Sequence, residues 1–236
     1  MERQPAIPSL LTGIVLALGF IAGCWVLATA LVEFKAMDRY VSVKGLAERE
    51  VPADLAMWPI SYSAGADTLS DLDAGLAQSR TQVMAFLKEQ GLGQADITTA
   101  APRIEENRYG SPDQRPVNRY TAQAVVTVRS SDITTIKKAM SAAGELVSRG
   151  VVLIQNYEYR PTFAFTKLNE IKPAMIAEAT RNARSAARQF AEDSGSTVGG
   201  IRRATQGYFS LEDRDQYTPE IKKIRVVTSV DYFLEK

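Results

Sequence analysis

The clearest pattern in the chain is an uncharged apolar stretch near its N-terminus. From Leu10 to Val32 the sequence reads LLTGIVLALGFIAGCWVLATALV, which is 23 residues without a charge. A helix of that length, at 1.5 Å of rise per residue, extends about 34 Å and can cross a hydrocarbon layer of about 30 Å. We therefore expect a transmembrane signal-anchor. The predicted organisation is a short N-terminal tail at 1–9, the signal-anchor at 10–32, a linker at 33–40 and one folded domain at 41–236.

Three fates of this apolar stretch are compatible with the residues. A retained anchor is favoured, because the apolar run exceeds the 7–15 residues typical of a signal peptide. Cleavage after Ala28-Thr29-Ala30 is the second, since small residues occupy both specificity positions. The third is lipid attachment at Cys24, because Ile21-Ala22-Gly23-Cys24 is similar to a bacterial lipobox. The favoured location is a single pass through a bacterial inner membrane with the C-terminal domain in the periplasm. The alternatives are a cleaved periplasmic protein or a lipoprotein.

After residue 40 the apolar positions alternate between a strand period and a helical period. Residues 119–129 (RYTAQAVVTVR) alternate as a half-buried strand does, whereas residues 168–190 carry a helical stripe made largely of alanine. Pro59 places its strand at an edge or a bulge, and Pro173 sets the start of the regular third helix near Lys172. Strands are expected at 40–51 (interrupted at Gly45), 55–66, 97–109, 119–129, 151–165, 201–209 and 223–233, and helices at 70–90, 131–146 and 168–190.

This order of elements predicts an α+β fold, with an antiparallel or mixed sheet and helices packed on one face. A weak echo, strand, helix, strand, polar loop, strand, occurs at 55–129 and again at 151–233, which indicates a pseudo-repeat. A single domain is favoured over two lobes because no Pro/Ser/Gly linker divides the chain. Aromatic residues in strand-like positions are expected in the core or on a sheet face; these are Trp58, Tyr62, Tyr157, Tyr159, Phe163 and Phe165.

Composition removes several kinds of chemistry. The chain has no histidine and one cysteine, so it cannot form a zinc site with nitrogen or sulfur ligands, a Ser-His pair or an internal disulfide. We expect no catalytic residue, no cofactor and no metal. The net charge of +1 lacks the basic excess that phosphate neutralisation requires, so no nucleic-acid partner is expected.

Three stretches resemble the SIMPL-domain family of bacterial periplasmic and membrane-anchored proteins. They are Val43-x-Gly45 through Pro52-Ala53-Asp54-x-Ala56, the segment Leu87–Thr99, and the alanine-periodic helix that leads to Gly199-Gly200. The likeness covers residues 41–235, with one extra residue before Asp54. It implies a periplasm-facing domain that assembles into homo-oligomeric rings, with a role in envelope or oxidative-stress defence, and it implies no catalytic residues.

Two polar loops combine charge with aromatic residues, the composition of interface hot spots. The first, 103–119, is rich in arginine, and the second, 208–217, is more acidic, so we predict contacts between the loops of neighbouring subunits. A solvated hairpin loop is the alternative. An arginine stripe on the third helix is interpreted as a solvated face. The candidate contact residues are Arg103, Arg108, Tyr109, Arg115, Tyr120, Asp213 and Asp215.

The function that these patterns favour is a membrane-anchored, self-assembling structural or interaction module of the cell envelope. A binding module for a small ligand or an envelope polymer is the alternative. An enzyme is the least favoured, because no nucleophile-base motif is present. The expected partners are the inner membrane, through residues 10–32, and other copies of the same chain.

Overall fold

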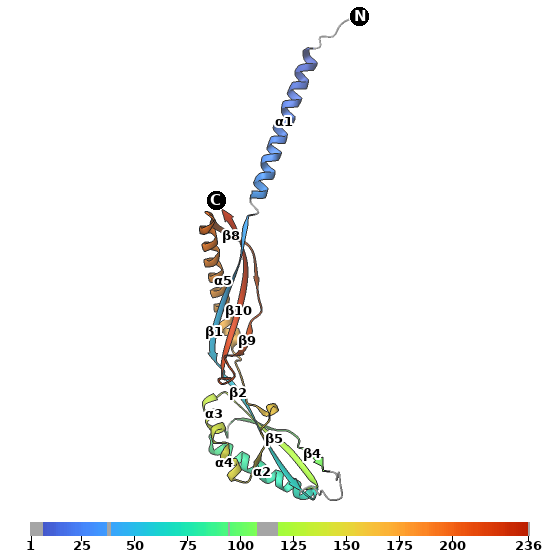
Figure 1. Cartoon of the computed structure of the whole chain (residues 1–236), viewed down its shortest axis with the longest axis vertical. Helices are drawn as coiled ribbons and strands as arrows, with labels where there is room; N and C mark the ends of the chain where they lie inside the picture. Colours follow the sequence, from blue (N-terminus) through green and yellow to red (C-terminus); the bar gives the residue numbers. More distant parts are fainter. Residues whose placement is uncertain (1–6, 37–38, 94, 108–117, 236) are drawn as a thin grey trace. The chain divides into compact units, whose positions relative to one another are not determined.

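The structure is a computed structural model that describes residues 7–36, 39–93, 95–107 and 118–235 (Figure 1). Within them the chain divides into two compact units, which are described separately below. Unit 1 comprises residues 1–47, 174–209 and 226–236, and unit 2 comprises residues 48–173 and 210–225. Three of the boundaries fall inside regular elements, so no linker marks them. The sequence therefore carries no sign of this division, and the predicted domain bounds stay a prediction.

The apolar stretch forms one helix, α1 (Ile7–Ala36). Its segment Gly13–Ala30 is long and apolar enough to cross a membrane, and the side chains of this segment are exposed. The hydroxyl of Thr29 donates to the carbonyl oxygens of Trp25 and Val26, each at 3.0 Å. The main polar side chain of the segment is therefore satisfied within the helix, as an apolar solvent requires.

Unit 1 is built on an antiparallel pairing of long strands. The strand order is β1 (Tyr40–Pro52), β10 (Ile221–Glu235) and β8 (Thr197–Gln206), and helix α5 (Leu168–Asp193) lies along this sheet (Figure 1). The predicted alanine stripe is the buried face of α5, because alanine lets a helix lie close to a sheet. Its fully buried members are Met175, Ala179, Ala183, Ala187 and Ala191.

Unit 2 contains a second antiparallel sheet with β2 (Leu55–Ala66) and β5 (Tyr120–Ser130) at its centre. Strands β3 (Asp96–Thr99) and β4 (Arg103–Glu106) pair with β5, whereas β6 (Val152–Leu153) and β7 (Thr162–Ala164) pair with β2. Strand β9 (Ser210–Asp213) pairs with the first residues of β10.

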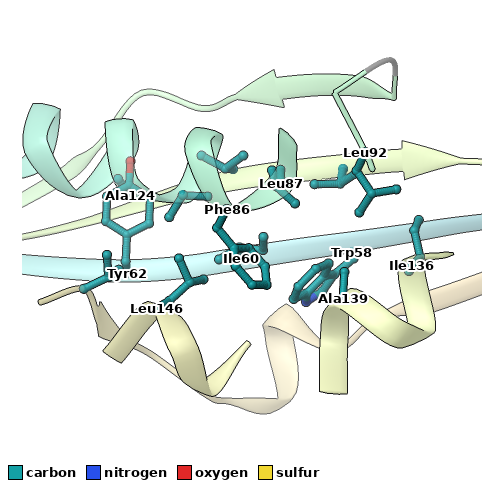
Figure 2. Packing of buried hydrophobic residues seen from close by; sticks show 14 of the residues in the cluster. Trp58, Ile60, Tyr62, Phe86, Leu87, Leu92, Ala124, Ile136, Ala139 and Leu146 are labelled. Carbon is teal, nitrogen blue, oxygen red and sulfur yellow. The ribbon is translucent and has the colours of Figure 1, made fainter. Parts of the chain in front are cut away.

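Three helices cover one face of this second sheet. They are α2 (Leu69–Glu89), α3 (Ile133–Ala142) and α4 (Gly144–Ser148), and they share one buried cluster with alternate residues of β2 and β5 (Figure 2). Trp58 lies opposite Val128 in the register, and both belong to this cluster. The α+β class, the antiparallel pairing and the helix-covered sheet face are thus as predicted.

The predicted echo is visible in the order of elements. β2-α2-β3-β4-β5 in one half corresponds to β7-α5-β8-β9-β10 in the other. In each half the last strand is long, and the two strands before it pair with that strand. The correspondence is one of topology, because the two halves share little residue identity.

Several boundaries differ from the prediction. The helix predicted at 70–90 begins at Leu69, after Thr68, whose hydroxyl accepts from the Asp71 amide at 3.2 Å. Asp132 caps α3, and a break at Ala143 divides the helix predicted at 131–146 into α3 and α4. Strand β1 is continuous through Gly45, and the strand predicted at 97–109 is divided into β3 and β4. Helix α5 begins at Leu168, so it accommodates Pro173 inside its second turn.

The long strand predicted at 151–165 was wrong. The segment contains β6, a 3₁₀ turn at Tyr157–Tyr159 and β7. The amide of Ile154 donates to the Ser61 carbonyl at 2.8 Å, so the backbone groups of Ser61 face this segment. Those of Pro59, two residues earlier on the same strand, face the same way, and proline has no N–H to donate. The ladder therefore fails at Pro59, where the segment leaves the sheet.

Candidate functional site

The first predicted contact loop is only partly described. Arg103 lies in β4 and is exposed, and its guanidinium pairs with Glu105 at 3.2 Å. Tyr120 begins β5, and the guanidinium of Arg119 lies 5.0 Å from its ring centroid. The other three predicted residues of this loop lie outside the described residues; they are Arg108, Tyr109 and Arg115.

The acidic residues of the second loop bind within the chain. Asp213, at the end of β9, pairs with Lys222, whose side chain is buried. Asp215 accepts a hydrogen bond from the Thr218 hydroxyl at 2.5 Å and two from backbone amides at 2.8 Å, and Arg214 pairs with it at 3.0 Å. The Thr218 hydroxyl and then Arg214 hold the pKa of Asp215 well below its usual range. Asp215 thus stabilises a turn.

The neighbouring charges fasten the turn to the rest of unit 2. Lys223 pairs with Glu48 at 2.7 Å and Arg214 approaches Glu50 at 3.6 Å, which ties the turn to β1. Glu220 pairs with Lys137 of α3, and this hydrogen bond lowers the pKa of the Glu220 carboxyl. The arrangement is one of paired charges.

Among the described residues of the two loops, no hydrogen bond or ion pair joins Arg103 or Tyr120 to Asp213 or Asp215. The predicted contact between loops of different subunits stays a prediction. In the described part of the chain no group of three or more His, Cys, Asp or Glu side chains lies close enough to hold a metal ion.

The structure adds a cavity that the sequence interpretation missed. It has a volume of about 470 Å³ and lies in unit 2, where the segment between β6 and β7 leaves the sheet. Its lining comes from β2, from α3 and the residue that follows it, and from residues 153–161. The lining residues are Trp58, Pro59, Ile60, Ser61, Met140, Ala143, Leu153, Ile154, Gln155, Asn156, Tyr157, Tyr159, Arg160 and Pro161.

Two interactions order the outer wall of this cavity. The Asn156 side chain accepts from the Tyr159 amide at 3.1 Å, and the Arg160 guanidinium stacks on the Tyr157 ring at 4.2 Å. Tyr157 and Tyr159 were expected in the core or on a sheet face, whereas they belong to a 3₁₀ turn beside the cavity. The sequence features that could have indicated this cavity are Pro59 and Pro161, because proline interrupts the pairing of a strand.

Comparisons with known proteins identify the family alone. The family model described as "SIMPL: Protein of unknown function (DUF541)" matches residues 41–230. No curated protein matches. Similar solved structures include an amidase of the hydantoinase/carbamoylase family from Burkholderia phymatum, with 14% identity, a TM-score of 0.24 and 56% of this chain covered. They also include a protein from Burkholderia cenocepacia described as an amidohydrolase/peptidase, with 16% identity, a TM-score of 0.22 and 57% covered.

The chain spans about a third of each of those two structures, 33% and 34%, and such low scores carry no argument about fold or activity. The family match, in contrast, covers most of the chain and agrees with the three stretches in which the resemblance was found. The chain belongs to the SIMPL family.

Proposed function

We propose that this protein is a non-enzymatic interaction module of the bacterial envelope, anchored by α1, with its SIMPL domain in the periplasm, and that it self-associates. Membership of the SIMPL family supports a periplasmic-type module. The exposed apolar surface of Gly13–Ala30 supports the anchor, because such a surface is stable in lipid and unstable in water. The absence of histidine from the whole chain supports a role without acid-base or nucleophilic chemistry.

The observation that carries self-association is the open edge of the sheet in unit 1. Strand β8 is an edge strand of ten residues in which only Val198 and Gly199 are half-buried and the others are exposed. An exposed edge presents unpaired backbone donors and acceptors, which another chain can pair with. Strand β1, on the other edge, is less available, because Asn182 donates to the Leu46 carbonyl at 2.8 Å. We therefore place the self-contact at β8.

Native mass measured in detergent tests this proposal on the full chain. Ile201 lies in β8 and is half-exposed, so Ile201→Lys adds a third positive charge beside Arg202 and Arg203 without disturbing a core. We expect one uniform assembly for the wild type and a smaller mass for Ile201→Lys. The matched control is Val147→Lys, at a similarly exposed apolar residue of α4, which should leave the mass unchanged.

A monomeric wild type in detergent contradicts self-association. The predicted loop contact is tested separately by charge reversal at Arg108 and Arg115, which lowers the mass if those loops join subunits. Topology is tested by adding protease to intact spheroplasts, which should digest the SIMPL domain. A protected domain contradicts the periplasmic location. A stress role is tested by comparing survival of a deletion strain and its parent after exposure to hydrogen peroxide.

A further inference from the structure

The cavity of unit 2 follows from the way the chain is built around Pro59. On one side of it, Met57 pairs with Thr162 of β7, and on the other the Ser61 carbonyl accepts from Ile154. Between these two anchors the segment 155–161 has to leave the sheet. The space that remains is therefore defined by paired backbone at both ends.

The size and walls of this cavity suit a small molecule with a ring. Its volume of about 470 Å³ lies in the range of about 300–1,000 Å³ that is usual for small-molecule sites. The buried Trp58 lies on the β2 side, and Tyr159 and Pro161 lie on the side of the departing segment. Flat apolar groups of this kind pack well against ring faces.

The polar groups of the lining are biased toward donors. Arg160 is the one charged residue in the lining, which contains no Asp or Glu. In the described part of the chain no carboxylate forms an ion pair with Arg160. Its stacking on Tyr157 uses the face of the guanidinium and leaves the N–H groups in the plane free for a bidentate carboxylate. The Asn156 oxygen already accepts from Tyr159, so its remaining groups are N–H donors.

We propose that this cavity binds a small organic carboxylate that carries a ring, with Arg160 pairing the carboxylate and the ring held against Trp58 and Tyr159. The inference does not depend on self-association, because all of the lining belongs to one molecule. An aromatic acid and a sugar acid share this chemistry, and the test distinguishes them.

The chain contains two tryptophans, Trp25 in α1 and Trp58 in the cavity. In a Trp25→Phe background, fluorescence therefore reports on Trp58 alone. Two matched pairs of probes are titrated into the full chain in detergent. The first pair is N-acetyl-L-phenylalanine and its neutral amide, and the second is N-acetylmuramic acid and N-acetylglucosamine, which lacks the carboxylate.

We expect a saturable change of Trp58 fluorescence with the acid of at least one pair, and a Kd at least tenfold lower than that of its neutral counterpart. Arg160→Gln should raise the Kd of the acid about tenfold and leave the neutral compound unaffected. The control Arg103→Gln, at an exposed arginine of the same unit, should change neither. The pair that responds identifies the ring class.

Equal affinity for acid and neutral compound overturns the proposal, as does an acid Kd that Arg160→Gln leaves unchanged. The proposal is also overturned if no probe binds saturably at concentrations up to about 10 mM, since a Kd of about 10 mM corresponds to a binding free energy of only a few kcal/mol. If circular dichroism shows that Arg160→Gln is unfolded, two measurements replace it. One is the comparison of acid and neutral compound in the wild-type cavity, and the other is the Kd of the acid for Arg160→Lys, which keeps the charge.

Discussion

The contact between Gly45 of β1 and helix α5 allows a sharp test of how unit 1 is packed. A Cβ built on Gly45 would lie 1.8 Å from the Ala179 carbonyl oxygen and 2.5 Å from the Ala183 nitrogen. Both atoms belong to the helix backbone, so no side-chain rotation can relieve the overlap. Gly45→Ala requires β1 and α5 to separate by about 1.7 Å before normal contact distances of about 3.5 Å return.

The expected cost follows from what this separation disturbs. Overpacking a core costs about 1–3 kcal/mol. The hydrogen bond from Asn182 to Leu46, at 2.8 Å, lies beside the clash, and its loss adds about 0.5–1.5 kcal/mol. We therefore expect Gly45→Ala to lower the free energy of unfolding by about 3 kcal/mol. For a domain of this size that corresponds to a decrease in Tm of about 6–12 °C.

Thermal unfolding followed by circular dichroism measures this change. The matched control is Gly200→Ala in β8 of the same sheet, where a Cβ meets nothing within 4 Å, and its effect should stay within about 0.5 kcal/mol. In the double variant Gly45→Ala/Ala179→Gly the loss should persist, because the obstacle at Ala179 is its carbonyl oxygen. A Gly45→Ala protein as stable as the wild type, or rescue in the double variant, refutes the reasoning.

Two further predictions concern polar groups below the surface. In the described part of the chain, the Thr228 hydroxyl is buried in β10 without a hydrogen-bond partner, so the isosteric Thr228→Val should raise the free energy of unfolding by about 1 kcal/mol in urea denaturation; a destabilised variant indicates a hidden partner. Asp213→Ala leaves the buried ammonium of Lys222 unpaired and should lower the free energy of unfolding by about 1–3 kcal/mol. Lys222→Met should lower it less, because the Asp213 carboxylate that it leaves behind is half-exposed to water. If Lys222→Met is the more destabilised variant in the same assay, the ammonium of Lys222 is not buried as the structure shows.

The parts of the fold that the sequence predicts well are those set by a local period. The apolar run of α1 and the alanine stripe of α5 each depend on residues within one element. Even there the reason for the alanines comes from elsewhere. They are small because β1 lies against them, with Gly45 at the closest point. Periodicity showed which face of α5 is buried, and the close approach itself is a property of two distant segments.

The candidate sites were harder to predict because composition does not show where a charge is used. Asp213 and Asp215 made their loop acidic, so it was predicted to contact another subunit. In the structure both carboxylates bind within the chain, to Lys222, Thr218 and Arg214. Arg160, in contrast, lies in a segment whose apolar and polar positions alternate as in a strand, so the sequence did not indicate it as a candidate residue. Its neighbours in space were set by Pro59, about a hundred residues earlier.

The prediction that Pro59 places its strand at an edge or a bulge was wrong, because β2 is paired on both sides and keeps its register with β5 through Pro59. The sequence alone could not show that pairing would be lost on one side only. In an antiparallel sheet each residue's N–H and C=O face one neighbour only, so the missing donor matters on one side of β2. Pairing with β5 continues through Pro59 because the backbone groups of Pro59 face away from β5, and the whole effect falls on residues 155–161. The alternating direction of the backbone groups along β2 therefore keeps the core of unit 2 intact and opens the cavity beside it. A sequence carrying proline at position 60 in place of 59 would be expected to interrupt the pairing with β5 instead.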